Sequence, residues 1–330
     1  METASQDHGV RRWWRIVVLV ALLALALVGF HPQRGSATAP AVEPASAASP
    51  VVIATIGVGD SPAGVAVSPD GSHVYTANFN GRSVSVVDAA IKKLTDTIPV
   101  GHFPYGVAVS PDGARVYATN SGDGSVSVID ARSNTVTNTV TVGAAPNGIA
   151  VSPDGLHVYT ANFDGRSVSV IDAHTLTVTD TIADGADPGT GPYAVAVSRD
   201  GSHLYTGNPF DGSVYVIDLA SKKVTDIIGV GGYPFALAVS PDGSNIYTAN
   251  NYGGMSVIDA ELKVVTDNIN VGGDPMGIAV SPDGSQIYTA SPFAGLLSVI
   301  DATTVKVTDN LTLGGYTYGV LGATHYALED

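Results

Sequence analysis

The feature that most constrains this chain is a motif of about 42 residues that recurs six times. Its most regular part is a four-residue turn, which reads Ser-Pro-Asp-Gly in five copies and Ser-Arg-Asp-Gly in one. The six turns begin at Ser68, Ser110, Ser152, Ser198, Ser240 and Ser281, with spacings of 42, 42, 46, 42 and 41 residues. Self-similarity at a fixed period predicts a repeat architecture in which each copy is one supersecondary unit.

Each copy predicts four short strands. In the first copy, residues 65–67 precede the turn, in which Pro fixes φ, Asp bonds nearby backbone and Gly adopts a left-handed conformation. Residues 74–76 and 83–87 then alternate with a period of two and are rich in β-branched and aromatic side chains, which favour strands. Residues 94–98 supply a fourth strand. Four strands in about 42 residues are typical of one β-propeller blade.

A short signature in the second strand of the copies supports this interpretation. Tyr-Thr-Ala-Asn or a close variant occurs at residues 75–78, 117–120, 159–162 and 247–250. These segments resemble the Y-V-T-N signature of the YVTN β-propeller family, and the resemblance extends over residues 51 to about 323. The fourth copy has Gly207 instead of Ala, and the sixth has Ser291 instead of Asn. The resemblance implies the fold and says little about activity, because related propellers serve as surface proteins, binding subunits and enzymes.

The two ends of the repeat region bear on the number of blades. Residues 51–56 match a fourth strand that no other strands precede, whereas 318–323 match a first strand and 325–327 a second. We therefore predict an all-β propeller with seven blades of four-stranded antiparallel sheet, closed by pairing of the N- and C-terminal strands. No sequence remains for the third strand of the seventh blade, so a six-blade ring with loose ends is the alternative.

The first fifty residues lack the repeat and differ in composition from the rest of the chain. Arg11, Arg12 and Arg15 precede fifteen apolar residues, a pattern typical of a secretory signal. Because a membrane-spanning helix needs about 20 residues, cleavage after 45–47 is favoured, with an uncleaved signal-anchor as the alternative. We predict a signal at 1–30, an Ala/Pro/Ser-rich linker at 31–50 and the propeller at 51–330. The protein is then extracytoplasmic, secreted or anchored, and contacts the membrane only through an uncleaved N-terminal segment.

Composition excludes several classes of function. The chain has no cysteine, which rules out disulfide scaffolds, thiol catalysis and covalent haem attachment. Its formal net charge is −15, and such a surface repels phosphate backbones, so we predict no nucleic-acid partner. The histidines lie mostly at strand starts, which disfavours a copper- or haem-bearing redox propeller. We predict no cofactor.

Positions that all copies share are explained by the fold. The aspartates that end the third strands are predicted to cap turns rather than to form a metal site: Asp88, Asp130, Asp172, Asp218, Asp259 and Asp301. The Asn of each signature is predicted to be a turn residue that bonds the backbone. His73, His157 and His203 occupy one solvated slot that other copies fill with Arg, Asn or Gln. We predict no metal site here.

Variable positions concentrate in two loops per blade, which the family resemblance places on one face, around the mouth of the central channel. The candidate ligand-binding residues on this face are His102, Phe103, Tyr105, Asn147, Tyr193, Tyr233, Phe235, Asp274, Met276, Tyr316 and Tyr318. Neighbouring loops add Phe79, Arg82, Phe163, Arg166, Phe210, Tyr252 and Phe293. Aromatic residues suit recognition surfaces, although the same rings could instead pack between blades and plug the channel.

The fourth blade carries an insertion at 184–191 on the same face. Asp184 and Asp187 could hold Ca²⁺ through oxygen ligands, but so many glycines are explained more simply by a flexible excursion.

These observations favour an exported, non-enzymatic propeller scaffold that binds a protein or peptide at the channel mouth. The alternative is a lactonase-like hydrolase, because similar seven-bladed propellers include enzymes that hydrolyse sugar lactones. That reaction needs acidic and basic groups to converge. His102 is the histidine in the variable loops, and Asp274 and Arg82 could join it if the fold brings them together. We predict no catalytic residue otherwise.

Overall fold

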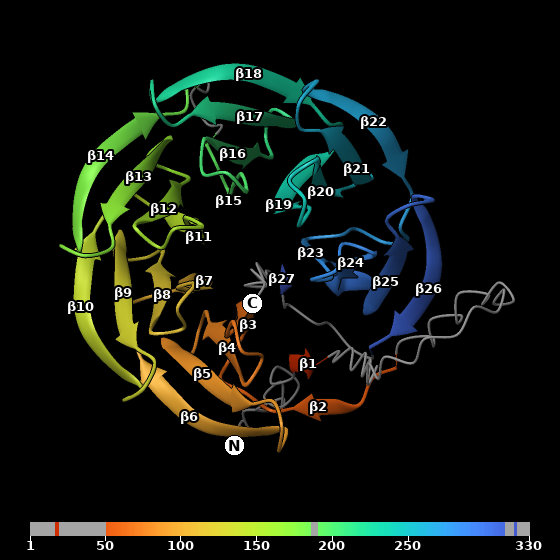
Figure 1. Ribbon diagram of the computed structural model, residues 1–330. Helices are drawn as coiled ribbons and strands as arrows, with labels where there is room; N and C mark the ends of the chain where they lie inside the picture. Colours follow the sequence, from red (N-terminus) through yellow and green to blue (C-terminus); the bar gives the residue numbers. More distant parts are fainter. Residues whose placement is uncertain (1–16, 20–50, 186–190, 314–319, 322–330) are drawn as a thin grey trace, which may run out of the picture.

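Six four-stranded antiparallel sheets surround a central axis (Figure 1). This computed structural model describes residues 17–19, 51–185, 191–313 and 320–321. In each blade the first strand lies innermost and the fourth lies at the periphery. The all-β propeller predicted from the repeats is thus confirmed.

The first three blades follow the predicted repeat. Blade one comprises β3 (Pro62–Val67), β4 (His73–Asn78), β5 (Ser83–Asp88) and β6 (Lys93–Pro99). Blade two comprises β7 (Pro104–Val109), β8 (Arg115–Asn120), β9 (Ser125–Asp130) and β10 (Thr135–Thr141). Blade three comprises β11 (Pro146–Val151), β12 (His157–Asn162), β13 (Ser167–Asp172) and β14 (Thr177–Ala183).

The last three blades have the same strand order. Blade four comprises β15 (Ala194–Val197), β16 (His203–Asn208), β17 (Ser213–Asp218) and β18 (Lys223–Gly229). Blade five comprises β19 (Tyr233–Val239), β20 (Asn245–Asn251), β21 (Gly254–Asp259) and β22 (Val264–Ile269). Blade six comprises β23 (Gly277–Val280), β24 (Gln286–Ser291), the short 3-10 helix η1 (Pro292–Ala294), β25 (Leu296–Asp301) and β26 (Lys306–Thr312).

The prediction of seven blades is wrong: the described chain forms six four-stranded blades. The terminal strands do not pair with each other, because β27 (Val320–Leu321) pairs in parallel with β3 of blade one. β2 (Ala54–Ile56) pairs instead with β1 (Val17–Leu19). β27 lies near the ring centre and β2 at its periphery (Figure 1), so a seventh blade would need middle strands that the described chain does not supply.

The N-terminal assignments remain predictions. β1 lies within the segment expected to be a signal, and the linker at 31–50 falls outside the described residues. Across the described ranges, no helix is long and apolar enough to cross a membrane.

The Ser-Pro-Asp-Gly turns are held by their own side chains. In blade one, Ser68 Oγ donates to Asp70 Oδ1 at 2.5 Å, and the Ser72 N–H donates to the same oxygen at 3.0 Å. Gly71 has φ 70°, a left-handed conformation that glycine adopts at little cost. The bond from Ser68 comes first among the causes that lower the Asp70 pKa to about 2. The turn chemistry predicted from the sequence is confirmed.

The aspartates that end the third strands cap turns, as predicted. In blade one, Asp88 Oδ1 accepts bonds from the N–H groups of Ala90 and Ile91, both at 2.9 Å. The signature asparagines behave differently from the prediction: Asn78 is fully buried, and its Nδ2 donates to Ser83 and Ser85 on the third strand, each at 2.9 Å. The asparagines of blades one, two, three and five are therefore interior links between strands.

The apolar core lies between neighbouring blades rather than in one central mass. One buried cluster joins blades one and two, a second joins blades three and four, and a third joins blades five and six. Further clusters fill the interface between blades two and three and that between blades four and five. Blades two to five thus bury both faces of their sheets against neighbouring blades and leave their loops free to vary.

Candidate functional site

Two loops per blade form the mouth of the propeller, as the resemblance implied. The loop between β4 and β5 meets the segment that leads into β3, because the Phe79 N–H donates to Ser61 O at 2.8 Å. In blade two, the Ser121 N–H donates to Phe103 O at 3.1 Å. Backbone bonds of this kind hold side chains from both loops on one face, which we call the mouth face.

Aromatic side chains on the mouth face form a continuous network. Five of them contact each other in a closed circuit: Tyr193, Phe163, Phe210, Tyr233 and Phe235. Their ring centroids lie 4.9 to 6.5 Å apart, within the range of favourable aromatic pairs. Blades three, four and five supply this circuit, so the rings link neighbouring blades at the mouth.

The network extends from this circuit in two directions. Tyr105 contacts Tyr193 edge-on at 5.4 Å and Phe79 at 6.2 Å, and Phe79 stacks on Phe103 at 4.9 Å. On the other side, Tyr252 contacts Tyr233 edge-on at 5.9 Å. The aromatic residues predicted for this face therefore do come together, and blades one to five contribute to one surface.

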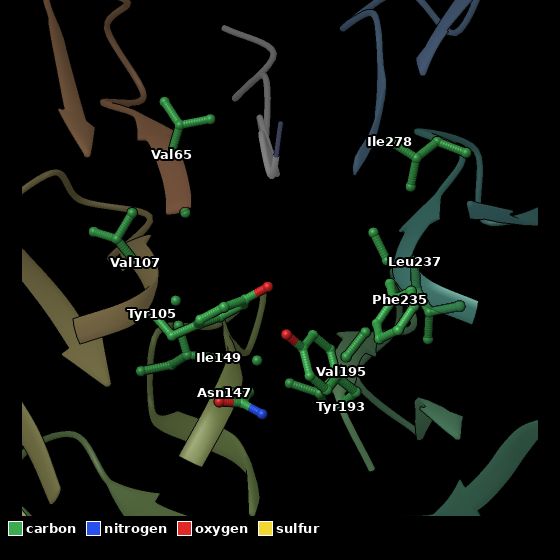
Figure 2. Close-up of a pocket in the computed structure, with 15 residues that line it drawn as sticks. Val65, Tyr105, Val107, Asn147, Ile149, Tyr193, Val195, Phe235, Leu237 and Ile278 are labelled. Carbon is green, nitrogen blue, oxygen red and sulfur yellow. The ribbon is translucent and has the colours of Figure 1, made fainter. Parts of the chain in front are cut away.

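A cavity of about 100 Å³ lies at the centre of the ring (Figure 2). Each innermost strand contributes one aliphatic residue to its lining: Val65, Val107, Ile149, Val195, Leu237 and Ile278. Tyr105, Asn147, Tyr193 and Phe235 complete the wall that the repeats predicted. The cavity is thus mostly apolar, with a few polar groups, which is typical of small-ligand sites.

Glycines in the innermost strands allow these strands to approach closely. A Cβ on Gly64 would lie 2.4 Å from the carbonyl oxygen of Tyr105, and one on Gly106 would lie 2.4 Å from that of Asn147. The Gly106 N–H also donates to Thr119 Oγ1, which in turn donates to Asn147 O at 2.9 Å. The backbones that carry Tyr105 and Asn147 are therefore fixed against the preceding blades.

The polar groups of the cavity are uncharged. Tyr105 and Tyr193 point their hydroxyl groups toward each other, and Asn147 lies on the same side (Figure 2). Burial raises the pKa of both phenols, and the neighbouring Tyr105 raises that of Tyr193 further. Asn147 is 7% exposed and its Oδ1 accepts a bond from Ser121 Oγ at 3.1 Å. Its amide nitrogen has no acceptor among the described residues.

A histidine–carboxylate pair lies beside the aromatic network. His102 Nδ1 is 2.7 Å from Asp123 Oδ1, and the His102 N–H donates to Asp123 Oδ2, also at 2.7 Å. The bond from the His102 N–H comes first among the causes that lower the pKa of Asp123. Both side chains are partly exposed. The carboxylate fixes the imidazole through Nδ1, which leaves Nε2 as the nitrogen that can act on a ligand.

The other predicted residues lie apart from the cavity lining or outside the described chain. Asp274 and Met276 are partly buried and do not line the cavity. Tyr316 and Tyr318 fall outside the described residues, as does Asp187 of the suggested Ca²⁺ loop. Asp184, the other acid of that loop, is buried.

Sequence reasoning missed Asp123. One signal could have identified it, because the loop from 121 to 124 reads Ser-Gly-Asp-Gly, whereas the equivalent loops of blades one and three begin with Phe and end with Arg. A departure from the repeat next to the loop of His102 marks a position that the fold does not require.

The protein is an all-β propeller, and comparisons with known proteins support this fold. Residues 149–243 match a family model described as a YNCE-like beta-propeller, and residues 88–175 match one described as a seven-bladed beta-propeller lactonase. Neither is the YVTN family, so that resemblance remains a prediction. A search of curated proteins found no match.

A chain of Kuenenia stuttgartiensis hydrazine synthase has a similar structure. The TM-score is 0.72 at 24% sequence identity, and the alignment covers 81% of this chain and 90% of that one. This likeness shows a shared fold. In all, 1829 chains of solved structures match, so the fold does not by itself discriminate between functions.

Proposed function

We propose that this protein is an exported, non-enzymatic propeller that binds a protein or peptide on its mouth face. The observation that carries the proposal is the continuous aromatic network around the cavity. Phe103, Phe210 and Tyr252 are 44%, 55% and 77% exposed, although each contacts another ring. Exposed rings held by their neighbours offer large contact area at low entropic cost, which is typical of recognition surfaces.

Panning a random peptide library on the full chain tests this proposal. A Phe210→Ser, Tyr233→Ser variant removes two rings of the network. Leu156→Ser is the matched control, because Leu156 is 58% exposed and follows a Ser-Pro-Asp-Gly turn away from the mouth loops. We expect peptides enriched on the parent and on the control to be lost on the double variant. Equal enrichment on all three proteins would contradict binding at the mouth face.

The His102–Asp123 pair favours a second candidate function, that of a lactonase-like hydrolase. Both residues lie within the segment that matches the lactonase model. A histidine oriented by a carboxylate can act as a general base on a water molecule, a role worth roughly 10²–10⁴ in rate. Arg82 also contributes to lowering the pKa of Asp123, whereas Asp274 is not part of the pair.

Hydrolysis of δ-gluconolactone by the full chain tests this second candidate. His102→Gln and Asp123→Asn should each reduce the rate at least about 100-fold, while Asp164→Asn, an exposed acid in the equivalent loop of blade three, should leave it unchanged. A rate no faster than the uncatalysed reaction, or one that all variants retain, would exclude the hydrolase.

A further inference from the structure

The lining of the channel cavity carries no charged side chain among the described residues. An anionic group in the cavity would lose its hydration without gaining a cationic partner at the cavity wall. A cationic group would lose its hydration without gaining a carboxylate partner at the cavity wall. The group that enters this cavity is therefore uncharged.

The polar atoms of the lining indicate which hydrogen-bond donors and acceptors the uncharged group carries. The Asn147 side chain lines the cavity and bonds Ser121 through Oδ1, so its amide nitrogen is a donor that a ligand in the cavity can use. A ligand with an acceptor oxygen can therefore bond to Asn147. The two neutral phenols can accept as well as donate. A carboxamide matches both requirements, because it has one carbonyl oxygen and an NH₂ group, whereas a carboxylate only accepts.

The size of the cavity limits how much of a ligand can enter. A volume of about 100 Å³ suits a side chain better than a whole peptide. The ring of Tyr193 lines the cavity and also contacts Phe163 of the mouth network. A larger ligand can therefore place one group in the cavity while the rest lies on the exposed rings.

We infer that the cavity accepts the carboxamide side chain of a Gln or Asn residue in the docked peptide, an inference that rests on the proposed function. The carboxamide oxygen accepts from Asn147 Nδ2, and its NH₂ group donates to the Tyr105 or Tyr193 hydroxyl. The aliphatic part of the side chain packs against the valines and isoleucines of the innermost strands.

NMR titration of the full chain with small probes tests this inference directly. Propionamide should shift the ring signals of Tyr105 and Tyr193, and propionate, which has the same shape, should bind at least tenfold more weakly. Asn147→Asp keeps the acceptor for Ser121 but removes the donor, so propionamide affinity should fall at least tenfold. Asn138→Asp is the charge-matched control, because Asn138 is exposed and the other blades carry aspartate at this position. It should bind propionamide like the parent.

Three results would overturn the inference: equal binding of propionate and propionamide, tighter binding of methyl β-D-glucopyranoside than of propionamide, and unchanged binding by Asn147→Asp. Tyr105→Phe gives a second variant if Asn147→Asp fails to fold, and it should also weaken propionamide binding. The peptide panning separates this inference from the proposed function. Peptides that depend on the rings but share no Gln or Asn would refute the carboxamide and leave the docking intact, whereas propionamide binding without ring-dependent peptides would refute the docking.

Discussion

Two arginines adopt a left-handed backbone conformation where the equivalent residue of every other blade is glycine. Arg82 and Arg166, just before the third strand, each have φ 47°. The matching residues elsewhere are Gly124, Gly212, Gly253 and Gly295. A residue with a Cβ loses about 1–2 kcal/mol in this conformation relative to its usual ones. The two arginines are therefore local sites of strain at the mouth.

Replacing Arg166 with glycine should stabilise the protein. The released strain exceeds the extra entropy that glycine loses on folding, so we expect a gain of about 0.5–1 kcal/mol in the free energy of unfolding. Urea denaturation measures the change. Arg132→Gly is the control, because Arg132 is exposed in a turn and its φ is not positive. If both substitutions change stability equally, backbone strain is not the cause.

The Ser-Pro-Asp-Gly turns make stability depend on pH. The pKa of Asp70 and that of Asp200 both fall to about 2, with the bonds from Ser68 and Ser198 as the largest causes. An unfolded aspartate titrates near about 3.9, so these turns contribute stability above about pH 4 and lose it as the pH falls toward 2. Asp70→Asn should therefore unfold more easily than the parent at pH 7, with a difference that shrinks between pH 4 and pH 2. A difference that does not vary with pH would contradict this account.

The candidate site could be predicted in part because repeats separate structural positions from variable ones. Tyr105, Asn147, Tyr193 and Phe235 share one repeat position, and the structure places all four at the cavity. Met276 shares it as well but does not line the cavity. The comparison could have marked Asp123 as variable, but its partner could not be predicted, since the bond joins it to a loop 21 residues earlier in the sequence.

At the scale of the element, the buried asparagine at the end of the second strand connects strands in blades one, two, three and five. Asn120 is fully buried, donates to Ser125 and Ser127 on the third strand, and accepts a bond from the Gly101 N–H at 3.0 Å. A Cβ on Gly101 would lie 2.6 Å from the Asn120 side chain, so glycine is required there. One amide thus connects two strands to the segment that enters the blade.

Asn120→Ala should destabilise the protein by about 2 kcal/mol, because it leaves buried partners without a hydrogen bond. Asn138→Ala, at an exposed position on β10, should change stability by less than about 0.5 kcal/mol. Thermal and urea unfolding of both variants provide the comparison. Similar losses would show that the asparagine is a surface turn residue after all.

The elements themselves follow closely from the sequence. Period-two alternation and the turn residues depend on local backbone physics, so the four strands of each copy were predictable. The number of blades was not, because it depends on where β2 and β27 pair, and pairing between distant segments leaves no local pattern. The prediction for the asparagines was wrong for a different reason: their serine partners are close in sequence but lie on the next strand, and the sequence does not show that the amide points into the blade.

At the scale of the whole molecule, each blade is stabilised by its neighbours. The apolar clusters lie between sheets, and on the outer strands Lys222 bonds Asp180 and Lys263 bonds Asp226 across consecutive blades. These pairs are partly exposed, so each contributes less than about 1 kcal/mol. The interblade packing therefore accounts for most of the stability of the ring.

If the chain is exported, as we propose, its N-terminus is expected to change. If the signal is removed after 45–47, the mature protein begins near Ala48 and lacks β1, so β2 loses the strand with which it pairs. Cell fractionation with N-terminal sequencing of the protein tests this expectation. An intact Met1 or Glu2 in the membrane fraction would show instead that the segment is kept as an anchor.

All the phenylalanines that the structure describes lie on the mouth face: Phe79, Phe103, Phe163, Phe210, Phe235 and Phe293. The described blade interiors contain tyrosines and aliphatic residues but no phenylalanine. A sample isotopically labelled in phenylalanine alone would therefore report on the mouth without interference from the blade interiors. Each ring would act as a built-in sensor, and the signals that move on adding a ligand would map where on the mouth it binds.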